Sequence, residues 1–144
     1  MYTCKFFAPH ELVYPSLYEQ YSTNPNKLYM AFDINALVTL DLLRKKYGPC
    51  VINNWKAGGS FKHSGLRPPD CEEGAALSQH KFGRAFDCKF SQVTPAEIWI
   101  DIEKNPSDEA FALIRRVERF DGMSWFHFDT GNNMGAGIRF IGAK

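Results

Sequence analysis

The sequence lacks a long apolar run, a recognisable signal peptide and an excess of positive charge. Its 144 residues contain no apolar run near the ~20 residues of a membrane-spanning helix, and its first residues include no sustained apolar region typical of a signal peptide. Its charge is nearly balanced, with 17 Lys and Arg against 16 Asp and Glu, so it lacks the positive field that holds nucleic acid. We therefore expect a protein made in the cytoplasm, with neither a membrane nor a nucleic acid as its partner.

Cysteine pairs of the kind that hold structural metals are also missing. The four cysteines, Cys4, Cys50, Cys71 and Cys88, form no C-x-x-C pair, which argues against a thiolate zinc knuckle. A chain of this length buries about 68–70% of its unfolded surface, enough for a core that needs no disulfides. We expect a single domain over residues 1–144 that is monomeric and carries free thiols.

Signals for both helices and strands are present. Leucines recur at helical spacing over residues 33–47, where Asp33 is a good N-cap. Thr94 and Glu97 have the spacing of a capping box and predict the start of another helix. The predicted helices cover residues 33–47, 94–105 and 107–117, and the predicted strands cover 50–55, a segment through Asp87 that ends at Phe90, 124–130 and 138–141. These elements favour an α+β fold with a small, mainly antiparallel sheet and helices packed on one side.

The candidate chemistry is concentrated in residues 78–87. His80 and Asp87 lie seven positions apart, a spacing that suits a glycine-containing bend leading into a strand rather than one face of a helix. An imidazole and a carboxylate are ordinary zinc ligands, and His127, the last histidine, lies downstream between aromatic residues. Three protein ligands leave a fourth position for water, as in catalytic zinc sites. The sequence therefore predicts one Zn²⁺ per chain, bound by His80, Asp87 and His127.

The same segments resemble a known family. Residues 78–87 read S-x-H-x-x-G-x-A-x-D, and together with the later aromatic-His segment they resemble the zinc peptidases of the D-Ala-D-Ala carboxypeptidase family. Residues 64–68, Ser-Gly-Leu-Arg-Pro, are similar to the Ser-x-Tyr-Arg segment of that family. The family shares its fold with the hedgehog signalling domain and with phage endolysins. The resemblance implies a zinc peptidase, either a carboxypeptidase or an endopeptidase, that cuts peptidoglycan stem peptides and is delivered to the cell wall. The small size and the missing signal peptide resemble phage lysis or virion-associated enzymes, and the sequence leaves open whether a phage or a cell encodes the protein.

The resemblance also implies roles for residues beside the metal. Ser78 resembles the family serine that touches the substrate. Arg67 precedes two prolines, which favour an extended backbone, and its planar guanidinium suits a substrate carboxylate or a developing oxyanion. The alternative for Arg67 is a structural salt bridge.

The general base is the position where the sequence departs from the family. The family places an acid three residues before the last ligand histidine, and Ser124 occupies that position here. Asp129 shares a strand face with His127, and Asp121 precedes His127 by six residues, a spacing similar to that in hedgehog domains. We favour Asp129 over Asp121 by a small margin, and orientation of a ligand imidazole is the alternative role for Asp129.

Two other functions compete with a peptidase. Ser124 at the acid position favours a domain of the same fold that binds metal, has lost catalysis, and serves in binding or in a virion. An iron oxygenase with a two-His-one-carboxylate triad is the third interpretation. It is disfavoured because such enzymes use His-x-Asp followed by a distant histidine, and no histidine follows His127.

Overall fold

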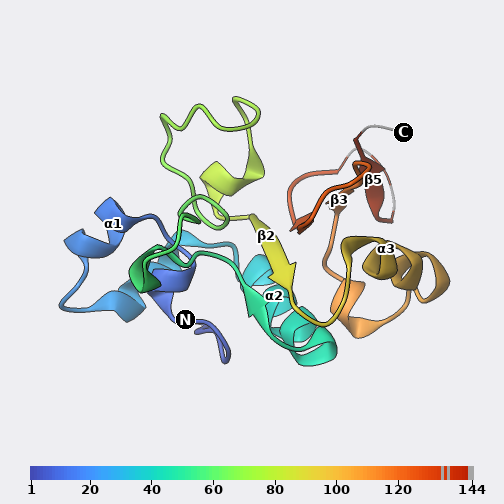
Figure 1. Cartoon of the computed structure of the whole chain (residues 1–144), viewed down its shortest axis with the longest axis horizontal. Coiled ribbons are helices and arrows are strands. Elements are labelled where there is room, and N and C mark those ends of the chain that lie inside the picture. The colour runs from blue at the N-terminus through green and yellow to red at the C-terminus, as the bar shows by residue number, and fades with distance from the viewer. Residues whose placement is uncertain (134, 136, 143–144) are drawn as a thin grey trace.

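The computed structural model describes residues 1–133, 135 and 137–142 and has an α+β fold (Figure 1). The described α-helices are α1 (Pro15–Gln20), α2 (Ile34–Tyr47) and α3 (Pro95–Lys104). The strands are β1 (Cys50–Val51), β2 (Ala85–Phe90), β3 (Arg116–Glu118), β4 (Phe126–Asp129) and β5 (Arg139–Ile141). Segments of 3₁₀ helix cover Pro9–Glu11, Pro25–Ala31, Trp55–Ala57, Gln79–Phe82 and Glu109–Phe111.

The strands form one mixed sheet in the order β1-β2-β4-β3-β5. The pairs β1–β2, β2–β4 and β3–β4 are antiparallel, as predicted, but β3 and β5 are parallel. Both β3 and β5 run opposite to β4, and β5 pairs with β3 instead of β4, so this pair is parallel. The α+β class is therefore confirmed, and the sheet is mixed rather than purely antiparallel.

The two central strands, β2 and β4, separate an apolar face from a polar face. Phe86 and Cys88 of β2 and Phe128 of β4 are buried in the main hydrophobic cluster, together with leucines of α2 and isoleucines of α3. Side chains alternate along a strand, so Asp87 and His127 point to the opposite face. The helices α2 and α3 thus pack away from these two residues, as the sequence predicts.

Both strongly signalled helices begin where the sequence predicts them. At the start of α2, the Asp33 carboxylate accepts a hydrogen bond from the Asn35 amide at 3.4 Å. At the start of α3, Thr94 Oγ1 accepts from the Glu97 amide at 3.2 Å, and the Glu97 carboxylate accepts from the Thr94 amide at 3.1 Å. Such caps satisfy amide donors that have no partner inside the helix.

The helix predicted over residues 107–117 is wrong. These residues form a 3₁₀ segment at Glu109–Phe111 and then enter strand β3 at Arg116–Glu118. The apolar residues of this short stretch fit a helical period, but Arg116, Val117 and Glu118 also alternate. The strand prevails because β3 pairs with β4 on one side and with β5 on the other.

The strand predicted over residues 50–55 is much shorter than expected. Only Cys50–Val51 pairs with β2. Beyond it, the Asn53 amide donates to the Glu11 carbonyl at 3.0 Å, so this backbone is held by the N-terminal segment instead of the sheet. The four cysteines are free, as predicted.

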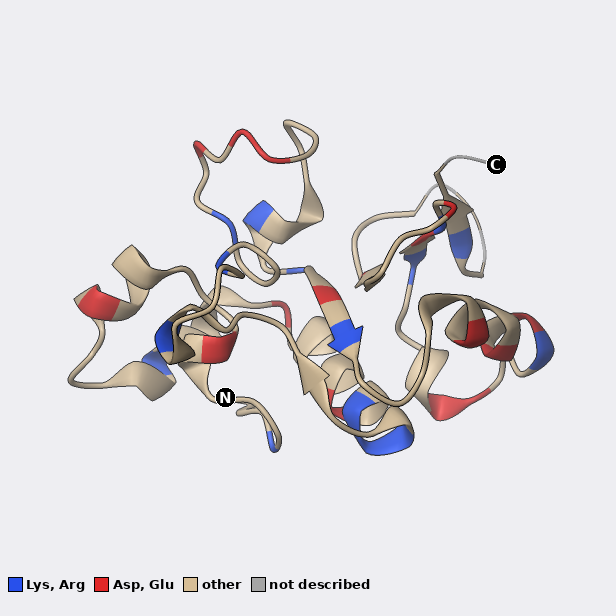
Figure 2. Cartoon of the chain, in the orientation of Figure 1, with Lys and Arg blue, Asp and Glu red and all other residues tan. Residues whose placement is uncertain are grey.

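Charged residues of both signs are spread over the elements (Figure 2). Basic residues occupy the last turn of α2, where they complement the negative end of the helix dipole. Acidic residues mark the loop that precedes the 3₁₀ segment at Gln79–Phe82 (Figure 2). Within the described ranges, no helix has the length and apolar character needed to cross a membrane.

Candidate metal centre

The bend around Gly83 positions His80. Ser78 Oγ accepts a hydrogen bond from the His80 amide at 3.4 Å and caps the 3₁₀ segment, which ends at Gly83 with a φ of 68°. A Cβ on Gly83 would lie 2.2 Å from the Ala31 carbonyl oxygen, so only glycine fits this bend. His80 Nδ1 lies 2.9 Å from the Gly65 carbonyl. Because a carbonyl only accepts, Nδ1 carries a proton, so Nε2 is the nitrogen of His80 that can offer a lone pair to a metal.

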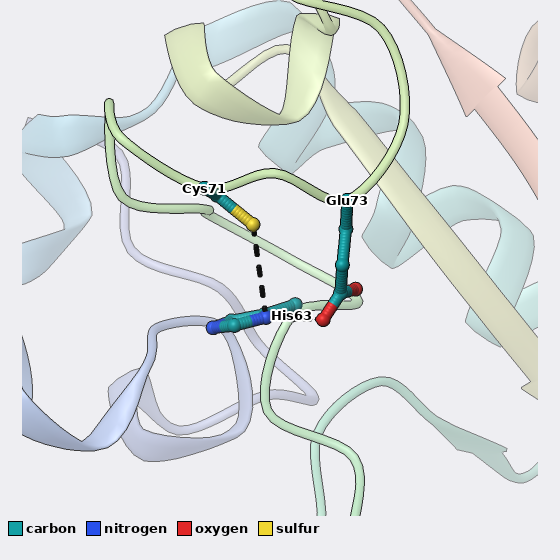
Figure 3. A group of neighbouring side chains, drawn as sticks. All are labelled: His63, Cys71 and Glu73. Carbon is teal, nitrogen blue, oxygen red and sulfur yellow. Dashed lines mark hydrogen bonds and ion pairs between the residues drawn. The ribbon is translucent and has the colours of Figure 1, made fainter.

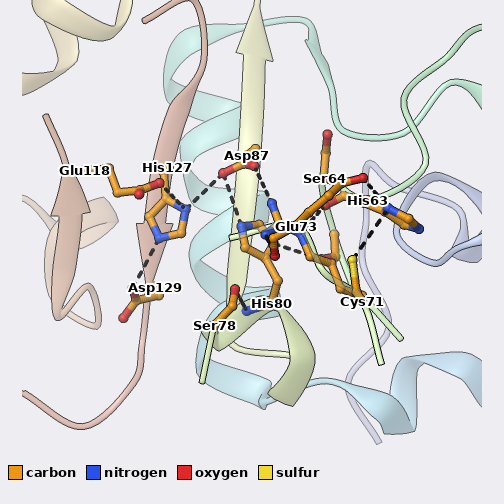
Figure 4. Close-up of polar contacts among 12 residues, drawn as sticks. His63, Ser64, Cys71, Glu73, Ser78, His80, Asp87, Glu118, His127 and Asp129 are labelled. Atoms are coloured by element: carbon orange, nitrogen blue, oxygen red, sulfur yellow. Dashed lines mark hydrogen bonds and ion pairs between the residues drawn. The ribbon is translucent and has the colours of Figure 1, made fainter. Parts of the chain in front are cut away.

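Asp87 and His127 meet across neighbouring strands. They are direct partners in the antiparallel pairing of β2 with β4. Asp87 Oδ1 lies 3.2 Å from His80 Nε2 and 2.9 Å from His127 Nδ1 (Figure 4). The three ligand atoms all lie within 4.8 Å of one another, and both imidazoles are buried. The predicted grouping is therefore confirmed as a cluster able to bind a metal ion, while the identity of the ion stays a prediction.

The ionisation of this cluster suits a cation. Burial raises the pKa of Asp87, but hydrogen bonds with His127 and His80 outweigh it and hold that pKa far below its usual value. Burial lowers the pKa of His127, but hydrogen bonds with Asp129 and Asp87 raise it to about 9. At neutral pH the metal-free cluster thus combines an ionised carboxylate with a protonated imidazole. A bound cation takes the place of that proton, which is the usual coupling of metal binding to proton release.

Two adjoining cavities open beside the cluster. One has a volume of about 390 Å³ and is lined by His80, Asp87, His127 and part of the loop at residues 73–77. The other has a volume of about 650 Å³ and is lined from the side of β1 and residues 61–64. Arg67, Glu73, Asp87 and Trp125 line both cavities. An extended ligand lying through both would therefore pass the metal ligands.

Arg67 contacts the cluster directly. Its Nε donates to the His63 carbonyl at 2.8 Å, one terminal nitrogen donates to the Glu73 carbonyl at 3.3 Å, and the other lies 3.3 Å from Asp87 Oδ2. The salt bridge expected as the alternative role of Arg67 is thus present. A guanidinium has five N–H donors and these contacts use three, so two remain for a ligand.

Asp129 lies behind His127, on the side away from Asp87. Its Oδ2 is 3.2 Å from His127 Nε2, while its Oδ1 accepts hydrogen bonds from Arg116 Nε at 3.0 Å and from the Gly131 amide at 3.1 Å. Burial raises the pKa of Asp129, but His127 and Arg116 outweigh it and keep that pKa low. This geometry favours the orienting role that the sequence analysis left open, because the carboxylate faces the nitrogen that does not point at Asp87.

The structure places the other predicted residues at different distances from the cluster. Ser78 caps the His80 turn and lines the smaller cavity, where a substrate contact stays a prediction. Asp121 is exposed in the turn between β3 and β4, and the described residues that line the two cavities do not include it. Ser124 lines the larger cavity.

Glu118 is an acid beside the cluster that the sequence analysis missed. Its Oε1 lies 3.1 Å from His127 Nδ1, the same nitrogen that faces Asp87 (Figure 4). Glu118 was overlooked because the preceding residues were predicted as a helix, which hid the alternation that continues from Arg116 through Val117. That alternation, which predicts a strand in place of a helix, was the available signal.

The comparisons with known proteins add no relatives. The chain matches no family model, no curated protein and no solved structure. The family resemblance therefore rests on the motifs at residues 64–68, 78–87 and 125–129, and the functional assignment rests on the geometry of the cluster.

Proposed function

We propose that the protein is a zinc-dependent peptidase that cleaves peptide bonds in peptidoglycan stem peptides. One observation carries the proposal: His80 Nε2, Asp87 Oδ1 and His127 Nδ1 converge where two cavities adjoin, with a second carboxylate and a guanidinium in contact with them. Metal ligands, a base and a cation beside one open site are the parts that hydrolysis of a peptide bond requires.

The donor set fits zinc. Two imidazole nitrogens and one carboxylate oxygen are ligands that catalytic zinc commonly takes, with a fourth position for water. Secondary contacts also fit, since His80 Nδ1 faces a backbone carbonyl and His127 Nε2 faces a carboxylate. Non-haem iron accepts a similar triad. We favour zinc because the neighbouring acid and guanidinium serve hydrolysis.

Glu118, Arg67 and Asp129 have separate roles in the proposed reaction. When bound, the ion would polarise the scissile carbonyl and lower the pKa of the attacking water to roughly 7. Glu118 Oε1 accepts a proton as the water oxygen bonds to the carbonyl carbon, and it returns that proton to the amine nitrogen as the C–N bond breaks. The two free N–H groups of Arg67 donate to the carbonyl oxygen as negative charge develops on it. Asp129 keeps the His127 ring in place.

The walls of the cavities carry charges of both signs, and their cations are the groups that could bind the carboxylates of a stem peptide. The smaller cavity is lined by Arg67 and Arg116 and by the acids Glu73, Asp87, Glu118 and Asp129, and Lys89 lines the larger one. Lys89 Nζ donates to Ser64 Oγ at 2.7 Å and lies 4.2 Å from the centre of the Phe61 ring, so the cation is held in place. Stem peptides carry free carboxylates, which these cations would bind. A phage origin and delivery to the cell wall belong to the same proposal.

A catalytically inactive metal-binding domain is the second candidate. It is favoured by Ser124 at the family acid position and by the salt bridge that Arg67 already makes with Asp87. In this case the cluster would bind a metal and Glu118 would take no part in catalysis. The two candidates differ in turnover and not in metal content.

The test combines metal analysis with cell-wall digestion. Protein purified without added metal is expected to carry zinc rather than iron, and the His127→Ala variant is expected to carry none at this site. Purified cell walls incubated with the zinc-loaded protein should gain new amino termini, identified by mass spectrometry. Iron in place of zinc would contradict the metal assignment. Zinc without new amino termini would favour the inactive domain.

A further inference from the structure

A second group of side chains able to bind a metal ion lies beside the cleft. His63, Cys71 and Glu73, which we call the loop cluster, have ligand atoms within 4.8 Å of one another (Figure 3). His63 Nδ1 lies 2.8 Å from Glu73 Oε1 and 3.8 Å from Cys71 Sγ. None of these residues belongs to the cluster of His80, Asp87 and His127.

The distances in the loop cluster match those around a tetrahedral metal. Zinc bonds of ~2.3 Å to sulfur and ~2.0–2.1 Å to nitrogen, at a tetrahedral angle, hold the two atoms about 3.6 Å apart. The corresponding nitrogen–oxygen separation is about 3.4 Å. The observed nitrogen–sulfur distance of 3.8 Å is close to the first value, whereas the nitrogen–oxygen distance of 2.8 Å is about 0.6 Å below the second. The carboxylate of Glu73, which is 60% exposed, would therefore move outward by about that amount to complete the geometry.

The chemical nature of the donors narrows the choice of ion. A thiolate and an imidazole are the ligands that zinc and the metals near it prefer, and they disfavour calcium and magnesium, which take oxygen ligands. The side chains of His63 and Glu73 are 19% and 60% exposed, so an ion has access and water can occupy the fourth position. A simple ion pair between His63 and Glu73 would not need the Cys71 sulfur beside the same ring nitrogen.

We propose that His63, Cys71 and Glu73 bind a second zinc-class ion, and that this ion fixes the loop at residues 68–77. The loop supplies one wall of the smaller cavity, through residues that include Glu73 and Leu77. Arg67 joins the two clusters, because it donates to the backbone carbonyls of His63 and Glu73 and also contacts Asp87. The second ion therefore holds the wall of the cleft and the guanidinium in one arrangement. The site does not depend on the protein being a peptidase.

Cobalt titration of the reduced protein tests the site, because Co²⁺ bound to a thiolate gives a near-ultraviolet charge-transfer absorption. The cluster of His80, Asp87 and His127 contains no thiolate, so this band cannot come from that cluster, and cysteine variants assign it among the four free cysteines. Wild-type protein is expected to develop the band, saturating at one equivalent of thiolate-bound ion, and to bind two equivalents of cobalt in total. Absence of the band from folded, reduced protein would overturn the proposal.

Matched variants assign the band to its residues. Cys71→Ser is expected to remove the band and one equivalent of metal, while Cys50→Ser, a control at another partly exposed cysteine, keeps both. His80→Ala should lose the other equivalent and keep the band. A band that survives in Cys71→Ser would overturn the assignment. If the proposed peptidase fails instead, the band is unaffected and only turnover is missing.

A measurement on wild-type protein avoids any dependence on variant folding. Cys71 is expected to react with iodoacetamide at least tenfold more slowly when zinc is present, because a coordinated thiolate is a poorer nucleophile than a free one. Cys50, measured in the same digest by mass spectrometry, should react at an unchanged rate. Equal rates for Cys71 with zinc and with chelator would overturn the proposal.

Discussion

The two faces of strands β2 and β4 differ in what holds their side chains. On one face, Phe86, Phe126 and Phe128 are fully buried among apolar residues of the helices. On the other face, Asp87 and His127 are held by hydrogen bonds and charge. The residues alternate along the same strands, so a single step in sequence moves from the hydrophobic core to the metal cluster.

This difference separates stability from chemistry. Burial of one large apolar side chain contributes roughly 1.5–3 kcal/mol, so the core face carries much of the folding free energy. A buried charge pair adds little net stability, because desolvation offsets its attraction, but removing one partner costs about 3–5 kcal/mol when the other charge is left unpaired. On the metal face Asp87 also contacts Arg67 and Asp129 also contacts Arg116. Substitution of His127 should therefore change binding and turnover more than it changes folding.

The largest effects are expected for His127 and Phe128, which are neighbours in β4 and point to opposite faces of the sheet. His127→Ala should abolish stoichiometric metal binding at the cluster and all turnover, with a modest change in stability. Phe128→Ala should lower the free energy of unfolding by about 3–5 kcal/mol, because it leaves a cavity in the core. Metal analysis and urea denaturation measure the two effects. Full metal occupancy in His127→Ala would remove His127 from the ligand set.

The next effect concerns the base. Glu118→Gln keeps the shape of the side chain and loses the proton acceptor, so turnover should fall by roughly 100-fold or more while metal content holds, since general bases contribute about 10²–10⁴. Asp121→Asn serves as the control, because Asp121 is exposed and remote from the cluster. Unchanged turnover in Glu118→Gln, together with a loss in Asp121→Asn, would transfer the role to Asp121.

Arg67→Lys should have a somewhat smaller effect. Lysine keeps the positive charge but cannot contact Asp87 and an oxyanion with one planar fork, so turnover should fall by roughly 10- to 1,000-fold. The cluster should keep its metal, because Arg67 is not a ligand. Arg119→Lys, at an exposed ion pair with Glu103, is the control. Wild-type turnover in folded Arg67→Lys would leave Arg67 as a structural salt bridge.

Asp129→Asn tests the orienting role within the metal face. Asparagine keeps the volume but weakens the contact with His127 Nε2, and loss of such partners typically lowers metal affinity by 10- to 100-fold. Metal titration by competition with a chelator measures the change. Turnover at saturating metal should stay within a few-fold of the wild type. A loss of 100-fold or more at full metal occupancy would show that Asp129 is the base instead.

Sequence predicts best those elements that are determined by contacts between residues close together in the chain. The caps at Asp33 and Thr94 fix two helix starts through contacts within three residues. The ligand cluster was also predictable, because a glycine bend after His80 and alternation around Asp87 and His127 restrict where these side chains point. The prediction that helices lie on the opposite face follows from the same alternation.

Features that depend on pairing with distant strands could not be predicted from local sequence patterns. Strand β3 forms because it has partners on both sides, one of which lies more than twenty residues further along the chain. Glu118 depends on that pairing for its place beside His127. The loop cluster joins residues that are close in sequence, but they lie in a loop without helical or strand periodicity, so no pattern predicts where their side chains point. Sequence thus predicted the cluster that could bind a metal and missed the acid next to it.

The smallest effect is expected for Asp101 on the helix side of the molecule, whose carboxylate is stabilised by hydrogen bonds and an ion pair and is not a candidate metal ligand. The Tyr47 hydroxyl donates to Asp101 of α3, and Lys46 Nζ lies 3.3 Å from the same carboxylate. Burial raises the pKa of Asp101, but the hydrogen bonds from Tyr47, Asn105 and Lys46 outweigh it and lower that pKa. A carboxyl with a lowered folded-state pKa adds stability above its unfolded value of about 3.9, and that stability is lost as pH falls through the folded value.

Tyr47→Phe should therefore cost about 1 kcal/mol at pH 7, below the usual range for a hydrogen bond to a charged group, because Asp101 is partly exposed. The difference from the wild type should be constant between about pH 5 and 8 and should shrink below about pH 4, as Asp101 is protonated in the unfolded chain and then in the folded one. Urea denaturation of both proteins in chelator, at pH 7 and pH 3, measures it. Titration of Asp87 and His127 is common to both proteins and cancels in the difference. An equal difference at both pH values would mean that Tyr47 stabilises the contact between α2 and α3 by packing alone. The helix side of the sheet would then be stabilised by apolar packing, and charge would matter only on the face that carries Asp87 and His127.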